Sequence, residues 1–251
     1  MCTLSWTTTR SGYELFFNRD ERTSRGPEQP PCESRSTNVR FLAPRDGDAG
    51  GTWITLNELG VTNCLLNGYS ESRGERTGPG RSRGLLVLDL AGLASSERVL
   101  EHLEASDLSP FEPFVLCTFQ PDSERSLVAR TIEWDGLVLA SRRLSGDDAP
   151  ICSSGHDAEA ARRRRRAEWD RMRALAPMTP ERLAEFHRSH LDSPGPESPC
   201  MHRADAQTRS MTRVQVASDR VRMSHAPGAP CTTSLGEPLM LDRRHASAPL
   251  R

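Results

Sequence analysis

The 251-residue chain contains no lysine, so all 33 of its basic side chains are arginines. P-loop proteins and Schiff-base enzymes both depend on a lysine, and both classes are therefore excluded. No run of about 18 apolar residues occurs, which predicts that no helix spans a membrane. The first ten residues lack the basic and apolar regions of a secretory signal, and we expect a cytoplasmic protein.

Aromatic residues are scarce, at 5% of the chain, and the formal net charge is only −1. A chain with so little net charge has no long-range field that would attract nucleic acid. The basic run from Arg162 to Arg166 is partly neutralised by Glu159, Glu168 and Asp170, and no aromatic residues interrupt it. We therefore interpret this run as a solvated helix face and predict no nucleic-acid partner.

The chain has seven cysteines, an odd number, and none are spaced as CxxC. This pattern is typical of reduced thiols rather than of a disulfide framework. Four side chains of metal-ligand type, His187, His190, Cys200 and His202, lie within sixteen residues. Their spacing fits none of the common zinc patterns, so the sequence predicts no metal site and no resident cofactor.

Apolar residues gather in short runs that predict strands near residues 2–9, 13–17, 51–56, 61–67, 114–119, 129–134, 137–140, 151–154, 211–217 and 220–225. Capping residues and periodicity predict helices at 95–105, 157–175 and 179–190. Residues 22–50 and 70–83 are expected to form loops. The pattern favours one antiparallel α+β domain over residues 1–231, followed by a disordered tail at 232–251.

Cys2 directly follows the initiator methionine, and a side chain this small permits removal of Met1. Cys2 would then carry a thiol and a free α-amine, which together supply a nucleophile and a base. In a tight hairpin centred on residues 10–12, position 2 lies opposite position 19 or 20. The sequence therefore predicts that Arg19 and Asp20 lie beside Cys2.

Several segments resemble the NRDE family, also called the transport-and-Golgi-organisation family. They are MCTLSW at the N-terminus, FFNRDE (16–21), GGTWITLNELG (50–60), LLNGY (65–69), SPFEPFVL (109–116), CSSG (152–155) and CMHRADAQTRS (200–210). The family is in turn similar to N-terminal-nucleophile hydrolases of the bile-salt hydrolase and penicillin V acylase group. The resemblance implies a four-layer αββα sandwich of mostly antiparallel sheets and cleavage of carbon–nitrogen amide bonds in a small amide or acyl substrate.

The resemblance also implies roles for individual residues. Cys2 matches the nucleophile, and Arg19 and Asp20 match the Arg and Asp that steady its thiolate and amine, although Asn18 or Glu21 could take either part. Asn67 matches an oxyanion-hole asparagine; a turn-capping role is the alternative. Ser154 stands where the acylases carry Asn, and Arg203 or Arg209 matches a late arginine that closes the site.

The resemblance also implies a second, non-catalytic hypothesis. Family members have proposed roles in haem trafficking and in lipid or acyl-CoA homeostasis, in which the same pocket would bind without cleaving. Haem would then be a ligand, and Cys2 or a histidine would contact its iron.

Overall fold

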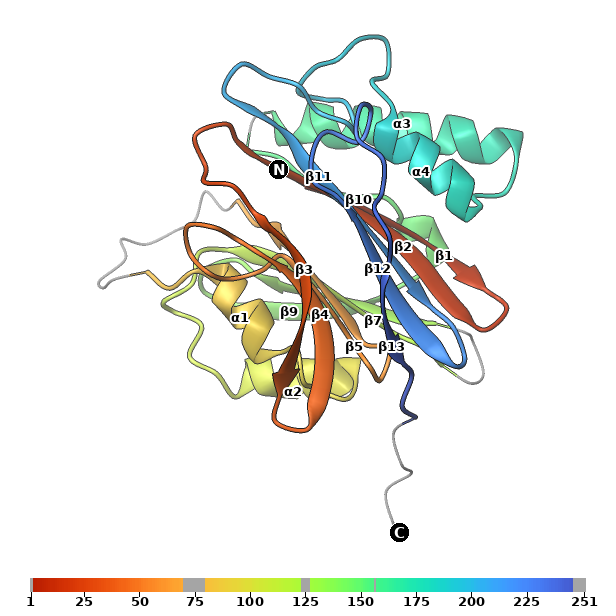
Figure 1. Ribbon diagram of the computed structural model, residues 1–251. Helices are drawn as coiled ribbons and strands as arrows, with labels where there is room; N and C mark the ends of the chain where they lie inside the picture. The colour runs from red at the N-terminus through yellow and green to blue at the C-terminus, as the bar shows by residue number, and fades with distance from the viewer. Residues whose placement is uncertain (1, 70–79, 123–126, 156, 246–251) are drawn as a thin grey trace.

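The computed structural model describes residues 2–69, 80–122, 127–155 and 157–245. Two antiparallel sheets pack face to face, and helices cover both outer faces (Figure 1). The first sheet has six strands in the order β10-β1-β2-β11-β12-β13, and the second has seven in the order β3-β4-β5-β6-β7-β8-β9. The predicted α+β, four-layer αββα sandwich is confirmed.

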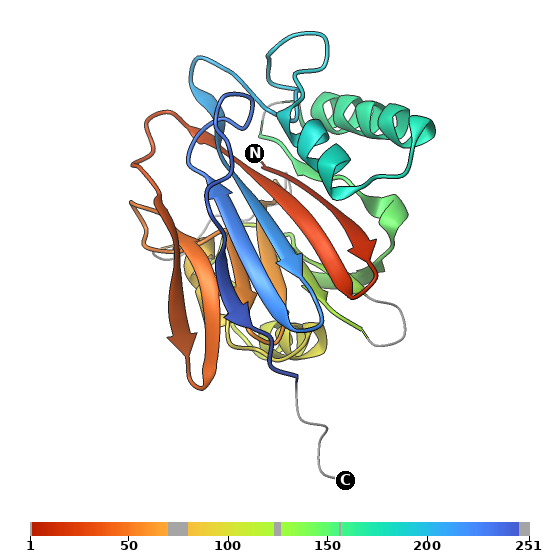
Figure 2. The same ribbon diagram turned by 45° about the vertical axis from the view of Figure 1, so that its right-hand side comes forward.

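The first sheet consists of β1 (Cys2–Thr9), β2 (Gly12–Arg22), β10 (Ile151–Ser153), β11 (Ala206–Val216), β12 (Arg220–Ala226) and β13 (Leu239–Asp242). Its outer face carries α3 (Ala158–Leu175) and α4 (Pro180–Arg188), as Figure 2 shows. Both helices and the hairpins β1–β2 and β11–β12 are present as predicted, but β2 continues five residues beyond the predicted end at 17 and β11 begins five residues before the predicted start at 211.

The second sheet consists of β3 (Gln29–Ser36), β4 (Val39–Arg45), β5 (Ile54–Asn57), β6 (Thr62–Asn67), β7 (Phe114–Gln120), β8 (Val128–Trp134) and β9 (Leu139–Leu144). Helices α1 (Arg83–Asp89) and α2 (Ser96–Glu104) cover its outer face. Ser95 caps α2 by accepting a hydrogen bond from the backbone N–H of Arg98, as its position in the sequence suggested.

The main core lies between the two sheets and takes side chains from both. Leu4 and Phe17 from the first sheet and Ile54, Leu66 and Phe119 from the second are fully or almost fully buried there. Alternation along each strand sends every second side chain to this interface. At the ends of β1 and β2, every second side chain therefore points towards the second sheet.

The expectation of one long loop at residues 22–50 is wrong, because β3 and β4 form a hairpin there. Strand β3 lies at the edge of its sheet, where two prolines and polar side chains are tolerated, so it carries no apolar alternation. Strand β4 buries only a short run, Phe41 to Pro44. Of the predicted loop at 70–83, residues 70–79 lie outside the described residues, and α1 begins at Arg83.

The expectation of a disordered tail is wrong for residues 239–242, which form β13 beside β12. Leu241 is buried against the core, whereas its neighbour Met240 is 53% exposed. One inward-facing side chain in a four-residue strand gives too little periodicity to detect in a sequence.

Candidate active site

Cys2 lies at the start of β1, between two neighbouring strands. It pairs with Arg19 of β2 on one side and with Ser153 of β10 on the other. Directly opposed residues in antiparallel strands point to the same face, so all three side chains face the second sheet. The backbone N–H of Cys2 donates a hydrogen bond to Ser153 Oγ at 3.2 Å. The predicted juxtaposition of Cys2 with Arg19 is confirmed.

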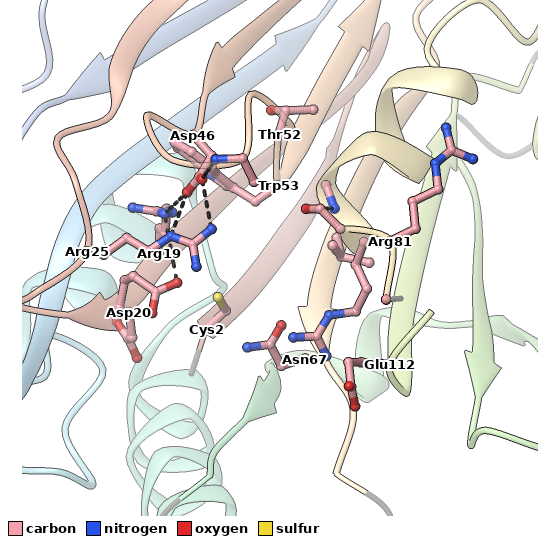
Figure 3. A pocket seen from close by; sticks show the side chains of 17 residues that line it. Cys2, Arg19, Asp20, Arg25, Asp46, Thr52, Trp53, Asn67, Arg81 and Glu112 are labelled. Carbon is pink, nitrogen blue, oxygen red and sulfur yellow. Dashed lines mark hydrogen bonds and ion pairs between the residues drawn. The ribbon is translucent and has the colours of Figure 1, made fainter. Parts of the chain in front are cut away.

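A cavity of about 590 Å³ opens between the two sheets at this point. Cys2, Arg19, Asp20 and Asn67 all line it, and Figure 3 shows the Cys2 sulfur lying between Asp20 and Asn67. Charged side chains contribute much of the remaining wall, namely Glu21, Arg25, Asp46, Arg81, Arg83 and Glu112. We refer to this space as the Cys2 cavity.

Arg19 is held by carboxylates from both directions. Its guanidinium donates to Asp46 Oδ2 at 2.6 Å and to Glu28 Oε2 at 3.0 Å, and it lies over the ring of Trp53, 4.4 Å from the ring centroid. Arg25 forms a second ion pair with Asp46, at 2.7 Å. Burial raises the pKa of Asp46, but the two arginines and backbone donors outweigh it, so the pKa is lowered and Asp46 is ionised.

Asp20 is 3% exposed, and buried donors hold its carboxyl group. Thr208 Oγ1 donates to Asp20 Oδ1 at 2.6 Å, and Arg165 Nη2 lies 3.5 Å from Asp20 Oδ2. Burial raises the pKa of Asp20, although the Arg165 guanidinium opposes that shift.

The prediction of a solvated basic run is wrong for Arg165, which is fully buried, and right for Arg162 to Arg164, which are exposed.

Burial also raises the pKa of the Cys2 thiol, and the Asp20 carboxylate adds to the shift, whereas Arg19 acts in the opposite direction. Cys2 is consequently a neutral thiol at pH 7. A base within reach must accept its proton before the sulfur becomes a nucleophile.

Close backbone contact brings α1 to the edge of the cavity. A Cβ on Gly51 would lie 2.5 Å from the carbonyl carbon of Gly84, and the Thr52 N–H donates to the Gly84 oxygen at 3.0 Å. Any larger residue at position 51 would push α1 away. This contact explains Gly51, whereas Gly50 has open space around it and adopts the left-handed φ of 67° that favours glycine.

Asn67 ends β6 and lines the Cys2 cavity, opposite the end of β2. Its side chain also hydrogen-bonds to Tyr69. An amide NH2 group has two donor hydrogens, so one bond to Tyr69 leaves another for a ligand. Ser154 is buried and lines a neighbouring cavity with Asn67 and Tyr69, rather than the Cys2 cavity.

Three further predicted site residues lie elsewhere. Asn18 points to the helical face, where its amide donates to the carbonyl oxygens of His187 and Pro199 at 2.8 and 2.9 Å. Arg203 pairs with Asp205 and lines a separate cavity that also contains Asp20 and Asn67. Arg209 donates to the Thr23 carbonyl oxygen and lines none of these three cavities.

The first 145 residues, more than half of the chain, match the family described as Transport and Golgi organisation 2. The chain belongs to this family. The family match covers Cys2, Arg19, Asp20 and Asn67, the four residues that share the Cys2 cavity, and ends before β10. No curated protein matches the sequence.

Solved structures similar to this family member include an acylase, an acid amidase and a conjugated bile acid hydrolase. A penicillin V acylase from Agrobacterium tumefaciens has a TM-score of 0.54 and 13% identity, covering 89% of this chain and 82% of its own. An N-acylethanolamine-hydrolyzing acid amidase ortholog from Caenorhabditis elegans has a TM-score of 0.57 and 9% identity, and the match covers 85% of this chain and 92% of the amidase chain. The C2A mutant of a conjugated bile acid hydrolase from Clostridium perfringens has a TM-score of 0.52 and 12% identity, and the match covers 96% of this chain and 92% of the hydrolase chain.

At such low identities, the likeness to these solved structures shows the fold alone: this family member has the N-terminal-nucleophile hydrolase fold.

Among the described residues, none of the helices combines the length and the apolar character needed to cross a bilayer.

Sequence reasoning missed the residues that hold Arg19 and Asp20 in place. Asp46 and Glu28 lie in the segment taken for a loop, while Arg165 and Thr208 come from α3 and β11. Glu28 lies nine residues after Arg19, and the other three are 27 or more residues from the residue that they contact. Single charged or hydroxyl side chains give no local signal of such pairing.

Proposed function

We propose that this protein is an N-terminal cysteine hydrolase that cleaves carbon–nitrogen bonds in small polar amides. The observation that carries the proposal is the position of Cys2 at the wall of the cavity, paired with Arg19 and facing Asn67. Removal of Met1 would turn the Cys2 backbone nitrogen into an α-amine on the same residue as the thiol.

In the proposed reaction, the α-amine accepts the thiol proton and the Cys2 sulfur attacks the amide carbonyl carbon. Ser153 Oγ, which already contacts this nitrogen at 3.2 Å, orients the amine. The Asn67 amide donates to the oxyanion that forms. The protonated amine then gives its proton to the leaving nitrogen as the carbon–nitrogen bond breaks, and water hydrolyses the resulting thioester.

Arg19 and Asp20 act on the charges of Cys2. The Arg19 guanidinium favours the thiolate, and the Asp20 carboxylate favours the protonated amine. The charged lining of the cavity favours substrates that carry polar or ionised groups beside the scissile amide. The many thiols favour a reducing compartment, and we propose the cytoplasm.

Binding of haem or acyl-CoA without cleavage stays an untested prediction. Among the described residues that line the Cys2 cavity, Cys2 alone offers a side chain that commonly ligates haem iron. The charged wall also differs from the apolar surface that a porphyrin needs. The geometry therefore favours the hydrolase proposal.

The test begins with the intact mass, which we expect to be lower by one methionine residue. The protein is then incubated with a panel of acyl-aminocoumarin amides that carry polar acyl groups, and acid-quenched samples are searched for an acyl thioester on Cys2. We expect Cys2→Ala to lower turnover at least about 1,000-fold and Asn67→Ala about 100-fold.

Cys32→Ser is the matched control, because Cys32 is an exposed thiol on β3. It should leave turnover unchanged. Retention of Met1 by active protein, or full turnover by Cys2→Ala, would contradict the proposal.

A further inference from the structure

We propose that His190, Cys200, His202 and Cys231 bind one Zn²⁺ ion and form a structural metal site. The inference is independent of the chemistry at Cys2. It departs from the sequence prediction of no metal, and it replaces one of the four residues considered there.

The four side chains, which we call the His/Cys cluster, converge although they come from three segments. One ligand atom from each lies within 4.8 Å of the other three. His202 Nε2 is 3.4 Å from the sulfurs of both Cys200 and Cys231. In a tetrahedral site with Zn–S near 2.3 Å and Zn–N near 2.0–2.1 Å, neighbouring ligand atoms are about 3.3–3.8 Å apart. The cluster needs only small movements to reach that geometry.

The histidine rings are oriented without stacking. The rings of His190 and His202 lie 5.0 Å apart with an interplanar angle of 78°. His190 Nε2 is buried and makes no hydrogen bond with any described part of the chain. A buried ring nitrogen without a partner costs free energy, and a metal bond at the cluster would offset that cost if this nitrogen is the ligand atom.

The backbone holds the ligands in place. The Cys200 N–H donates to the Ser189 carbonyl oxygen at 3.0 Å, which ties it to the residue before His190. The backbone of His202 pairs with that of Gln207, near the start of β11, in an isolated antiparallel β-bridge. A preformed site of this kind loses less conformational entropy when the ion binds.

The donor set selects the ion. Two thiolates and two neutral imidazoles balance the charge of Zn²⁺, and binding would release the two thiol protons to solvent. Tetrahedral sites with two cysteines and two histidines are typical of zinc. Four protein ligands leave no open position for a substrate, so the role is structural and not catalytic.

The site would stabilise the segment that supports Asp20. Met201 lies between two ligands, and its N–H donates to Thr208 Oγ1 at 2.8 Å. The Thr208 hydroxyl in turn donates to Asp20. The ion would link the end of α4, the segment before β11 and the segment after β12, close to the Cys2 cavity but outside it.

His187, which was grouped with these ligands by spacing, is excluded by its contacts. Its Nε2 lies 2.8 Å from Ser5 Oγ on the face of α4 that packs against β1. Cys231 takes its place, and it lies 29 residues after His202. No common spacing rule would have included it.

The experiment measures metal in the full chain, purified under reducing conditions without chelator. We expect about one zinc per chain by elemental mass spectrometry. After exchange with Co²⁺, we expect visible absorption bands of tetrahedral cobalt and a near-ultraviolet thiolate charge-transfer band. These wild-type measurements decide the question even if variants fold poorly.

Cys231→Ser and His190→Ala should each lose most of the bound zinc, and Cys231→Ser should weaken the charge-transfer band. Cys32→Ser is the control and should keep the full metal content. Wild-type protein that takes up neither metal, or that contains a Cys200–Cys231 disulfide under the same conditions, would overturn the proposal.

Discussion

His187 is a buried, uncharged imidazole on the face of α4 that packs against the first sheet. Phe16 and Phe186 surround it, with ring centroids 5.8 and 5.5 Å from its own, and Ser5 is its hydrogen-bond partner. Burial lowers the pKa of His187 to about 3, and the charge of Arg165 adds to the shift. The surroundings thus exclude the protonated form until the pH is very low.

This shift predicts a dependence of stability on pH. Below pH 6.5 the unfolded state binds a proton at His187 that the folded state does not bind, down to about pH 3. Each pH unit in that window should lower the free energy of unfolding by up to about 1.4 kcal/mol. Urea unfolding at pH 6 and at pH 5 measures this loss of unfolding free energy.

The matched variant is His187→Gln, which does not titrate and keeps a polar group near Ser5. Its free energy of unfolding should fall less between pH 6 and pH 5 than that of the wild type, by about 1 kcal/mol. Equal losses in both proteins would show that His187 is not the source.

Among the elements, β13 is the one whose contribution to folding is least visible in the sequence. It pairs with β12 at the edge of the first sheet and places Leu241, 3% exposed, against the core. Its other side chains, including Met240, are exposed. One buried leucine therefore carries most of the packing of this strand.

Leu241→Ala should lower the free energy of unfolding by about 2 kcal/mol, because it removes buried apolar surface at a sheet edge. Met240→Ala, on the opposite face of the same strand, should change it by less than about 0.5 kcal/mol. Urea unfolding of the two variants compares them directly. Similar values for both would mean that β13 does not pack on the core in solution.

Across the whole molecule, Arg19 joins the two sheets at the Cys2 cavity. It extends from β2 in the first sheet to Asp46, which follows β4 in the second. Its second partner, Glu28, also contacts His225 of β12 at 2.9 Å. Arg19 thus fixes the spacing of the sheets where Cys2 lies.

Arg19→Ala would leave two buried carboxylates with fewer partners and should cost about 3 kcal/mol of stability. Arg98→Ala is the control, because Arg98 and its partner Glu101 are 69% and 58% exposed; it should cost less than about 0.5 kcal/mol. Chemical denaturation measures both. A loss for Arg19→Ala as small as that of the control would show that the ion pairs do not hold the sheets.

Some elements could be predicted from the sequence and others could not, for physical reasons. The β1–β2 hairpin was predictable with its register, because a short turn fixes which residues face each other. The β3–β4 hairpin was not, since β3 is an edge strand with little to bury. Arg165 was assigned to solvent because a run of five arginines contains no sign that one of them meets a buried carboxylate.

By itself, the sequence determined the strands and helices with clear periodicity, the family, and the closeness of Cys2 to Arg19, because all of these depend on local pattern. Only the tertiary structure decided which cavity Asn67 and Ser154 line, what holds Asp20, and that Cys231 lies beside His202. Those contacts join segments far apart in the chain. They follow from the packing of layers on one another, for which no short stretch of residues carries a signal.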